Sequence, residues 1–111
     1  MNTIEDCWIE NHADQNGNPT GGRVDGVGLK IQWQDGPLGR GEERLAPNGV
    51  FVETVISAAK QRLEYFQRAS DGKFSCEENA LAIKKLGEAL KHLESRTKTR
   101  EERGVEGTHK V

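Results

Sequence analysis

The spacing of apolar residues changes along the chain, and each spacing predicts a different kind of element. Val27, Leu29, Ile31 and Trp33 alternate with polar residues or glycine. This period of two is typical of a strand with one buried face. It therefore predicts a strand over residues 27–34 and a core position for Trp33.

Shorter apolar pieces lie upstream of this strand. Those around Trp8 and Val24 flank a turn-rich segment over residues 15–22, and we expect them to add strands to a small antiparallel sheet. Residues 36–49 then form a glycine-rich connection. Because it lacks the spacing of a Walker or dinucleotide-binding motif, a flexible connector is the simpler interpretation.

Two longer segments have the spacing of helices. Apolar side chains recur at helical intervals over residues 50–69 and along one narrow stripe over residues 75–103. A glycine-containing turn separates the two segments. Ser75 and Glu78 match a capping box at the start of the second helix, and Gly104 matches its end. Together these signals predict a helical hairpin.

The whole pattern predicts an α+β fold, in which a small N-terminal antiparallel β-sheet is followed by a hairpin of two long α-helices. The chain fits a single domain over residues 1–111, with strands and turns in residues 1–35 and an extended tail over residues 104–111. Hydrophobic residues make up 33% of the chain and charged residues 31%. A core this thin can be completed by sharing helical stripes between subunits, so a homo-oligomer is expected.

Composition also argues against several classes of protein. The net charge of -2 disfavours binding to duplex nucleic acid, which needs a dominant basic surface. No apolar run reaches the roughly 18 residues of a membrane span, and the N-terminus lacks the pattern of a secretory signal. A cytoplasmic protein is therefore expected, with Cys7 and Cys76 as reduced thiols.

Neither a metal site nor a catalytic site is predicted. The chain has no CxxC, HxxxH or HExxH spacing. No cysteine or serine is placed to act as a nucleophile with His12, His92 or His109 as its base. No pair of carboxylates lies in an apolar segment. We expect no cofactor and no enzymatic activity.

Asn79 interrupts the apolar stripe of the second helix. The other stripe positions are Cys76, Ile83, Leu86, Leu90 and Leu93. A buried amide needs a hydrogen-bond partner. Two interpretations stay open: the amide fixes register and oligomeric state, or it binds a base edge or a ribose hydroxyl of a ligand.

Arginines follow on the same helix. Arg96 and Arg100 share a face, and Arg103 lies one turn further on. Arginine suits bidentate recognition of phosphate, which favours an anionic ligand. Interleaved glutamates fit a solvated helix with weak ion pairs equally well.

Three aromatic residues surround the predicted turn between the helices. Phe66 continues the apolar stripe of the first helix and is most simply a core residue. Tyr65 lies off that stripe, and Phe74 precedes the predicted cap, where a staple residue packs. Either ring could instead stack on a nucleobase.

Several short motifs together resemble the phage proteins of the Thoeris anti-defence protein 1 family. They are Lys-Ile-Gln-Trp-Gln-Asp-Gly-Pro from residue 30, Pro-Asn-Gly from residue 47, Cys-x-x-Asn-Ala-Leu from residue 76, and Arg-Thr-x-x-Arg-x-x-Arg-Gly-Val-Glu-Gly-Thr-His from residue 96. The resemblance covers roughly residues 26–111.

This resemblance implies a molecular sponge that acts in the host bacterial cytoplasm. Members bind cyclic ADP-ribose isomers made by bacterial TIR-domain proteins and sequester them without cleavage. Some also hold cyclic oligonucleotides at a separate place, and members assemble as homo-oligomers of up to six subunits. By resemblance, a hexameric homo-oligomer with a small cyclic nucleotide as its partner is expected here.

The resemblance also implies roles for particular residues. Asn79 would contact the adenine or ribose part of the signal, and Arg96 and Arg100 would bind phosphate or belong to the second site. Arg44 matches a loop arginine, although the acidic pair Glu42-Glu43 beside it argues against a phosphate there. The stacking aromatic belongs near the turn, which leaves all three rings as candidates.

Two alternatives come from other classes. The helical hairpin could dock on a host protein as an inhibitor, with Asn79 setting register alone. The chain could also be a virion or assembly accessory protein.

Overall fold

The computed structural model describes residues 2–4 and 6–110, and the chain divides into two compact units. The sheet unit comprises residues 1–51 together with 103–111, and the helical unit comprises residues 52–102. The predicted fold class is confirmed: an antiparallel sheet is followed by two long helices. The single-domain assignment stays a prediction.

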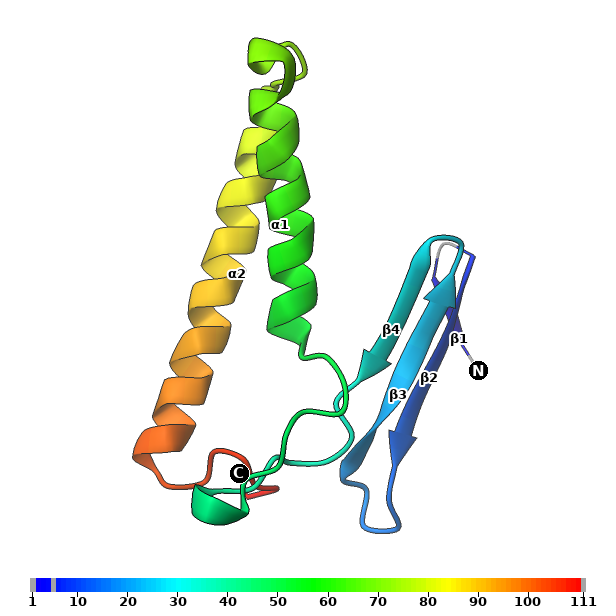
Figure 1. Ribbon diagram of the computed structural model, residues 1–111, viewed down its shortest axis with the longest axis vertical. Coiled ribbons are helices and arrows are strands. Elements are labelled where there is room, and N and C mark those ends of the chain that lie inside the picture. The colour runs from blue at the N-terminus through cyan, green and yellow to red at the C-terminus, as the bar shows by residue number, and fades with distance from the viewer. Residues whose placement is uncertain (1, 5, 111) are drawn as a thin grey trace. The chain divides into compact units, whose positions relative to one another are not determined.

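The sheet consists of four antiparallel strands in sequential order (Figure 1). They are β1 (Asn2–Ile4), β2 (Cys7–Ala13), β3 (Pro19–Gly26) and β4 (Leu29–Trp33).

The predicted strand over residues 27–34 begins too early. Gly26 pairs with Leu29, so Val27 and Gly28 form a two-residue hairpin loop in which Val27 is fully exposed. Gly28 has a φ of +74°, which glycine adopts without strain. The alternation of apolar residues continues across this turn, so it does not show where the strand begins.

Trp33 is half-buried rather than central to a core. A parallel bridge joins Trp33 to Val50. The amide of Val50 donates to the carbonyl of Gln32, and the carbonyl of Val50 accepts from the amide of Gln34. Among the described residues, the one buried large apolar side chain is Leu38, at 7% exposure, in the glycine-rich connection. The core of the sheet unit therefore lies where the connection folds back, not under the strands.

The two faces of the sheet differ in character. The register places Ile9, Val24 and Ile31 side by side on one face. The opposite face carries charged and polar residues together with Trp8: Glu10, Arg23, Asp25, Lys30 and Gln32.

The helical unit is a hairpin of α1 (Val52–Arg68) and α2 (Glu77–Glu102) (Figure 1). A 3₁₀ turn, η2 (Ala69–Gly72), follows α1. Ser70 and Asp71 have left-handed φ values of 50° and 58°, and such residues reverse the chain within a few positions. Gly104, with φ +73°, lies just beyond the end of α2, as a C-terminal capping glycine does.

The predicted capping box is wrong. The hydroxyl of Ser75 donates to the carbonyl of Gly72 at 2.7 Å, so it completes the turn instead of capping the helix. Cys76 is the capping residue: its sulfur accepts the amide of Asn79 at 3.4 Å and its carbonyl accepts the amide of Ala80. The side-chain amide of Gln67 donates to the backbone carbonyl of Cys76 and accepts from its backbone N–H, each at 3.0 Å.

The hairpin buries little of its apolar surface. Neither α1 nor α2, both described throughout, contains a buried residue. The stripe positions Asn79, Ile83, Leu86 and Leu90 are half-buried, and Leu81 is exposed. A pair of helices covers only one side of each partner, so the remaining sides stay accessible.

Candidate functional site

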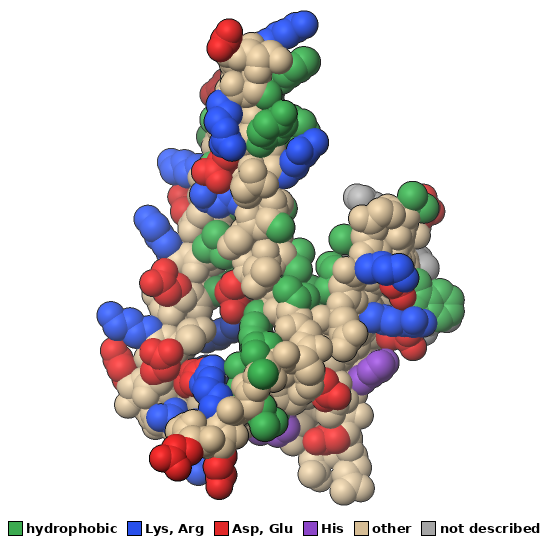
Figure 2. Space-filling view, viewed as in Figure 1, with side chains coloured by type: hydrophobic (Ala, Val, Ile, Leu, Met, Phe, Trp, Pro, Cys, Tyr) green, Lys and Arg blue, Asp and Glu red, His purple; other side chains and the backbone are tan. Residues whose placement is uncertain are grey.

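The tip of the hairpin carries partly exposed aromatic rings with arginine side chains over their faces. Tyr65 and Phe66 are 42% and 37% exposed, with ring centroids 6.1 Å apart. The guanidinium of Arg62 lies 5.1 Å from the first centroid and 4.8 Å from the second, and that of Arg68 lies 5.8 Å from Tyr65. These four residues form the tip cluster, and Figure 2 shows basic and apolar side chains gathered at this end of the hairpin.

The tip cluster corrects the prediction for Phe66. Its ring contacts the guanidinium of Arg62 instead of a core. The cause is the two-helix architecture, because α2 covers one side of α1 and leaves residues off that side in solvent. Arg62 was not singled out from the sequence, although its spacing of three and four from the two rings predicts the contact.

Phe74 is the most exposed of the three aromatic candidates, at 56%. It lies in the turn before α2, and the ammonium of Lys73 is 5.5 Å from its centroid. It is therefore less covered than Tyr65, which has two guanidiniums near its ring. Of the three rings, Phe74 has the surface most open to a stacking partner.

Asn79 lies at the same end of the hairpin, in the first turn of α2. It is half-buried, and its backbone amide is bound to Cys76. Its side-chain amide makes no hydrogen bond to any described residue. A half-buried amide in this state can accept and donate hydrogen bonds to a ligand or to a second subunit.

Arg96 and Arg100 lie at the other end of α2. At a rise of 1.5 Å per residue, Arg96 is about 25 Å from Asn79 along the helix. The structure therefore does not bring the amide and these guanidiniums together within one chain. Arg96 donates to Glu53 of α1 at 3.3 Å in a largely exposed pair, and Arg100 is half-buried.

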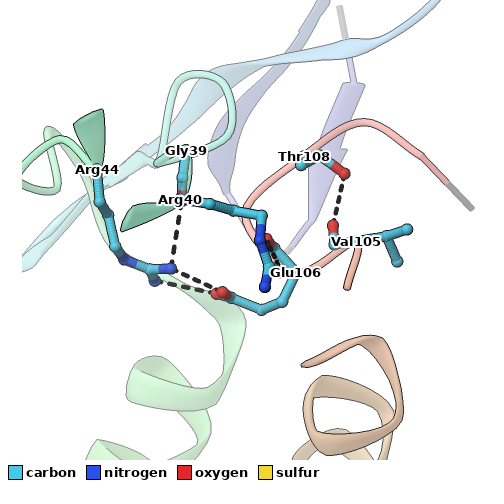
Figure 3. Close-up of polar contacts among 6 residues, drawn as sticks. All are labelled: Gly39, Arg40, Arg44, Val105, Glu106 and Thr108. Carbon is cyan, nitrogen blue, oxygen red and sulfur yellow. Dashed lines mark hydrogen bonds and ion pairs between the residues drawn. The ribbon is translucent and has the colours of Figure 1, made fainter. Parts of the chain in front are cut away.

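Arg44 belongs to the sheet unit and is held by the C-terminal tail (Figure 3). Its two terminal nitrogens donate to the carboxylate of Glu106 at 2.7 and 3.0 Å. The neighbouring Glu42-Glu43 pair forms a 3₁₀ turn, η1 (Gly41–Glu43), and makes no ion pair with any described residue. The carboxylate partner of Arg44 thus comes from the tail, 62 positions away, and was missed in the sequence.

The tail is folded rather than extended as predicted. The backbone amide and the hydroxyl of Thr108 both donate to the carbonyl of Val105, at 3.1 Å and 2.5 Å. Gly104 and Gly107 have φ values of +73° and +77°, which reverse the chain. Arg103, which precedes these turns, is exposed.

A groove of about 500 Å³ lies on the sheet unit. Its charged lining is largely paired internally: Arg23 contacts Glu10 and, at 3.3 Å, Asp25, which lies 3.7 Å from Lys30. The guanidinium of Arg23 lowers the pKa of Glu10, with a smaller contribution from Trp8. Paired charges of this kind offer no excess of either sign to a ligand.

Within the described residues, no helix combines the length and apolar character needed to span a membrane. No group of three or more His, Cys, Asp or Glu side chains in the described part could hold a metal ion.

Fold and site together define a class: a small α+β protein whose helical hairpin presents an exposed aromatic and cationic tip. The chain belongs to the Acb2/Tad1 family, because the sequence model of the Acb2/Tad1 hairpin domain matches residues 25–98. It is similar to "Thoeris anti-defense 1" of Bacillus phage SBSphiJ7, with 55% identity over 62 residues. That alignment covers 56% of this chain and 42% of the relative, so the chain matches less than half of the relative's length.

Proposed function

We propose that this chain is a phage anti-defence protein that binds a cyclic ADP-ribose-type immune signal and holds it without cleavage. Family membership and the name of the relative support an anti-defence role. The observation that carries the ligand class is the hairpin tip, where exposed rings, guanidiniums and the Asn79 amide lie at one end. The protein acts in the host bacterial cytoplasm, where the signal is made.

Each group at the tip matches one part of such a signal. A nucleobase stacks on an open ring, and Phe74 is the ring with the most accessible surface. A guanidinium lying over an aromatic ring keeps its N–H groups at its edges, where they can bind phosphate. The Asn79 amide suits a base edge or a ribose hydroxyl. Passive capture needs no general acid or base, which is why we propose no enzymatic activity.

Arg96 and Arg100 require a separate role in this proposal. A cyclic dinucleotide is much smaller than the roughly 25 Å that separates them from Asn79 on one helix. We assign them to a second anion site that suits cyclic oligonucleotides. The thin core of the hairpin supports a homo-oligomer, which we propose to be a hexamer.

The test is recovery of the ligand. The protein is incubated with cyclic ADP-ribose isomers, separated from free ligand, and heat-denatured, and the released molecule is identified by mass spectrometry. Intact ligand is expected. A hydrolysed product would place the protein among enzymes, and failure to retain any isomer would contradict the proposal.

Replacing Asn79 tests the site itself. Asn79→Ala should weaken capture by roughly a factor of ten, since one ligand hydrogen-bonding group is lost. The matched control is Gln61→Ala, at an exposed position of α1. If Asn79→Ala dissolves the oligomer without changing capture by the remaining folded protein, the amide sets register instead.

A second candidate is an inhibitor that docks on a host protein. It is favoured by the accessible apolar surface of the hairpin, which includes Val52 and Leu81 at 50% and 51% exposure. Calorimetry separates the two functions: this candidate predicts no heat with any cyclic ADP-ribose isomer.

A further inference from the structure

The glycine-rich loop and the C-terminal tail form a defined contact within the sheet unit, which we call the loop–tail clasp. It consists of Gly39, Arg40 and Arg44 from the loop and of Glu106 and Gly107 from the tail. Figure 3 shows the contacts of Glu106 with the loop. The carboxylate of Glu106 accepts two hydrogen bonds from the guanidinium of Arg44. The backbone carbonyl of Glu106 accepts a hydrogen bond from the guanidinium of Arg40 at 3.2 Å. The amide of Gly39 donates to the carbonyl of Gly107 at 2.9 Å.

The close approach of the two segments depends on glycine. A Cβ at Gly107 would lie 2.3 Å from the carbonyl oxygen of Gly39, and both glycines have a φ near +80°. Any other residue would need the backbones to separate. The clasp is therefore specified by the sequence and is not an incidental contact of a surface tail.

The contact remains accessible to solutes. The side chain of Arg44 is 41% exposed and that of Glu106 is 21% exposed. Ion pairs that reach solvent are weak and exchange with ions in solution. A carboxylate and a phosphate present the same pair of acceptor oxygens to a guanidinium fork. Glu106 thus occupies the position that a phosphate oxygen pair would take on Arg44.

We infer that Glu106 is a built-in competitor that sets which anions the Arg40–Arg44 loop accepts. A molecule with one carboxylate gains nothing over the resident carboxylate and does not displace it. A molecule with two linked phosphates carries more charge and can reach both Arg40 and Arg44. The ligand class is therefore a diphosphate or phosphodiester, and the inference rests on the proposed function in taking such a nucleotide as the natural ligand.

The decisive variant is Glu106→Gln. It removes the negative charge and keeps the shape of the side chain. The backbone contacts of the tail to Gly39 and Arg40 do not involve the carboxylate, so the tail stays in place. With inorganic pyrophosphate as the probe, affinity measured by calorimetry at low ionic strength should rise roughly three- to tenfold.

The matched control is Glu42→Gln, which makes the same charge change in the same loop without touching Arg44. It should raise the affinity for pyrophosphate less than twofold. Acetate, a carboxylate probe, should bind the wild-type protein too weakly to displace Glu106. Equal affinities in the two variants, or weaker binding by Glu106→Gln, would overturn the inference and make Glu106 a positioning residue.

A second variant covers the case in which Glu106→Gln does not fold. Glu106→Asp keeps the charge but shortens the side chain, so the bidentate contact cannot form without movement of the tail. Its affinity for pyrophosphate should lie between those of the wild type and Glu106→Gln, and an affinity equal to that of the wild type would contradict competition.

The two proposals fail separately. If cyclic ADP-ribose isomers are not retained but the pyrophosphate affinity rises in Glu106→Gln, the proposed function alone is wrong. If the isomers are retained intact and Glu106→Gln behaves like Glu42→Gln, the inference alone is wrong.

Discussion

The hairpin tip and the loop–tail clasp place arginine in two different environments. At the tip, Arg62 lies over the rings of Tyr65 and Phe66, which bear no formal charge. In the clasp, Arg44 faces the carboxylate of Glu106. An aromatic ring orients a guanidinium without consuming its hydrogen-bonding edge, whereas a carboxylate orients it and competes for that edge. The tip is thus open to an anion, and the clasp admits one only by exchange.

The largest effect is expected where the clasp depends on backbone geometry. Gly107→Ala places a methyl group 2.3 Å from the carbonyl oxygen of Gly39 and forces a positive φ on alanine. The free energy of unfolding should fall by about 2–4 kcal/mol, measured by urea denaturation.

The control for this prediction is Gly104→Ala. Gly104 also has a positive φ, of +73°, but nothing lies within 4 Å of an added Cβ. This variant should therefore lose only the cost of the backbone strain, about 1 kcal/mol. Equal losses in the two variants would show that the loop–tail contact adds nothing to stability.

The hairpin tip should respond in binding rather than in stability. Phe74→Ala should reduce the affinity for a cyclic ADP-ribose isomer by roughly 1–3 kcal/mol, because the most exposed ring of the tip loses its stacking face. Calorimetry measures the change, and unchanged urea denaturation shows that the hairpin is intact.

Tyr65→Ala is the comparison for that result. Two guanidiniums already lie near the Tyr65 ring, at 5.1 and 5.8 Å, so its removal should affect stacking less. A larger loss of affinity in Tyr65→Ala than in Phe74→Ala would mean that a nucleobase displaces the arginines.

Features that depend on near neighbours in the chain were predictable, and features that join distant segments were not. The two helices follow from apolar spacing. The strand predicted over residues 27–34 runs through the hairpin loop, although a glycine such as Gly28 is a local sign of a turn. The cap of α2 is different, because Gln67, nine positions earlier, holds Cys76. A pattern of neighbouring residues cannot predict a contact that spans the turn between the helices.

The same limit applies to the candidate site. Asn79 was identified from helical spacing and the aromatic residues from their place around the predicted turn, and all of them lie at one end of the hairpin. The distance of Asn79 from Arg96 follows from the geometry of the one helix that carries both. The pairing of Arg44 with Glu106 was not predictable, since turns at two glycines bring the tail back to the loop.

The smallest effect is expected on the charged face of the sheet. Arg23, followed by Trp8, lowers the pKa of Glu10 from its ordinary value of 4.5. A carboxyl with a lowered pKa in the folded protein adds stability above its unfolded pKa, and this stability is lost as the pH falls through the lowered value. Glu10→Gln should therefore be slightly less stable than the wild type at neutral pH, and the two should become equal at a pH below the lowered pKa, where the carboxyl is protonated.

Urea denaturation at both pH values measures this convergence, with Glu42→Gln as the control for a carboxylate without an arginine partner. This Glu10–Arg23 contact resembles the clasp in charge, but it joins two adjacent strands of the sheet instead of a loop and a tail. If Glu10→Gln cost as much stability as Gly107→Ala, charge pairing would outweigh backbone contact, and the contrast between the two environments of arginine would need a different explanation.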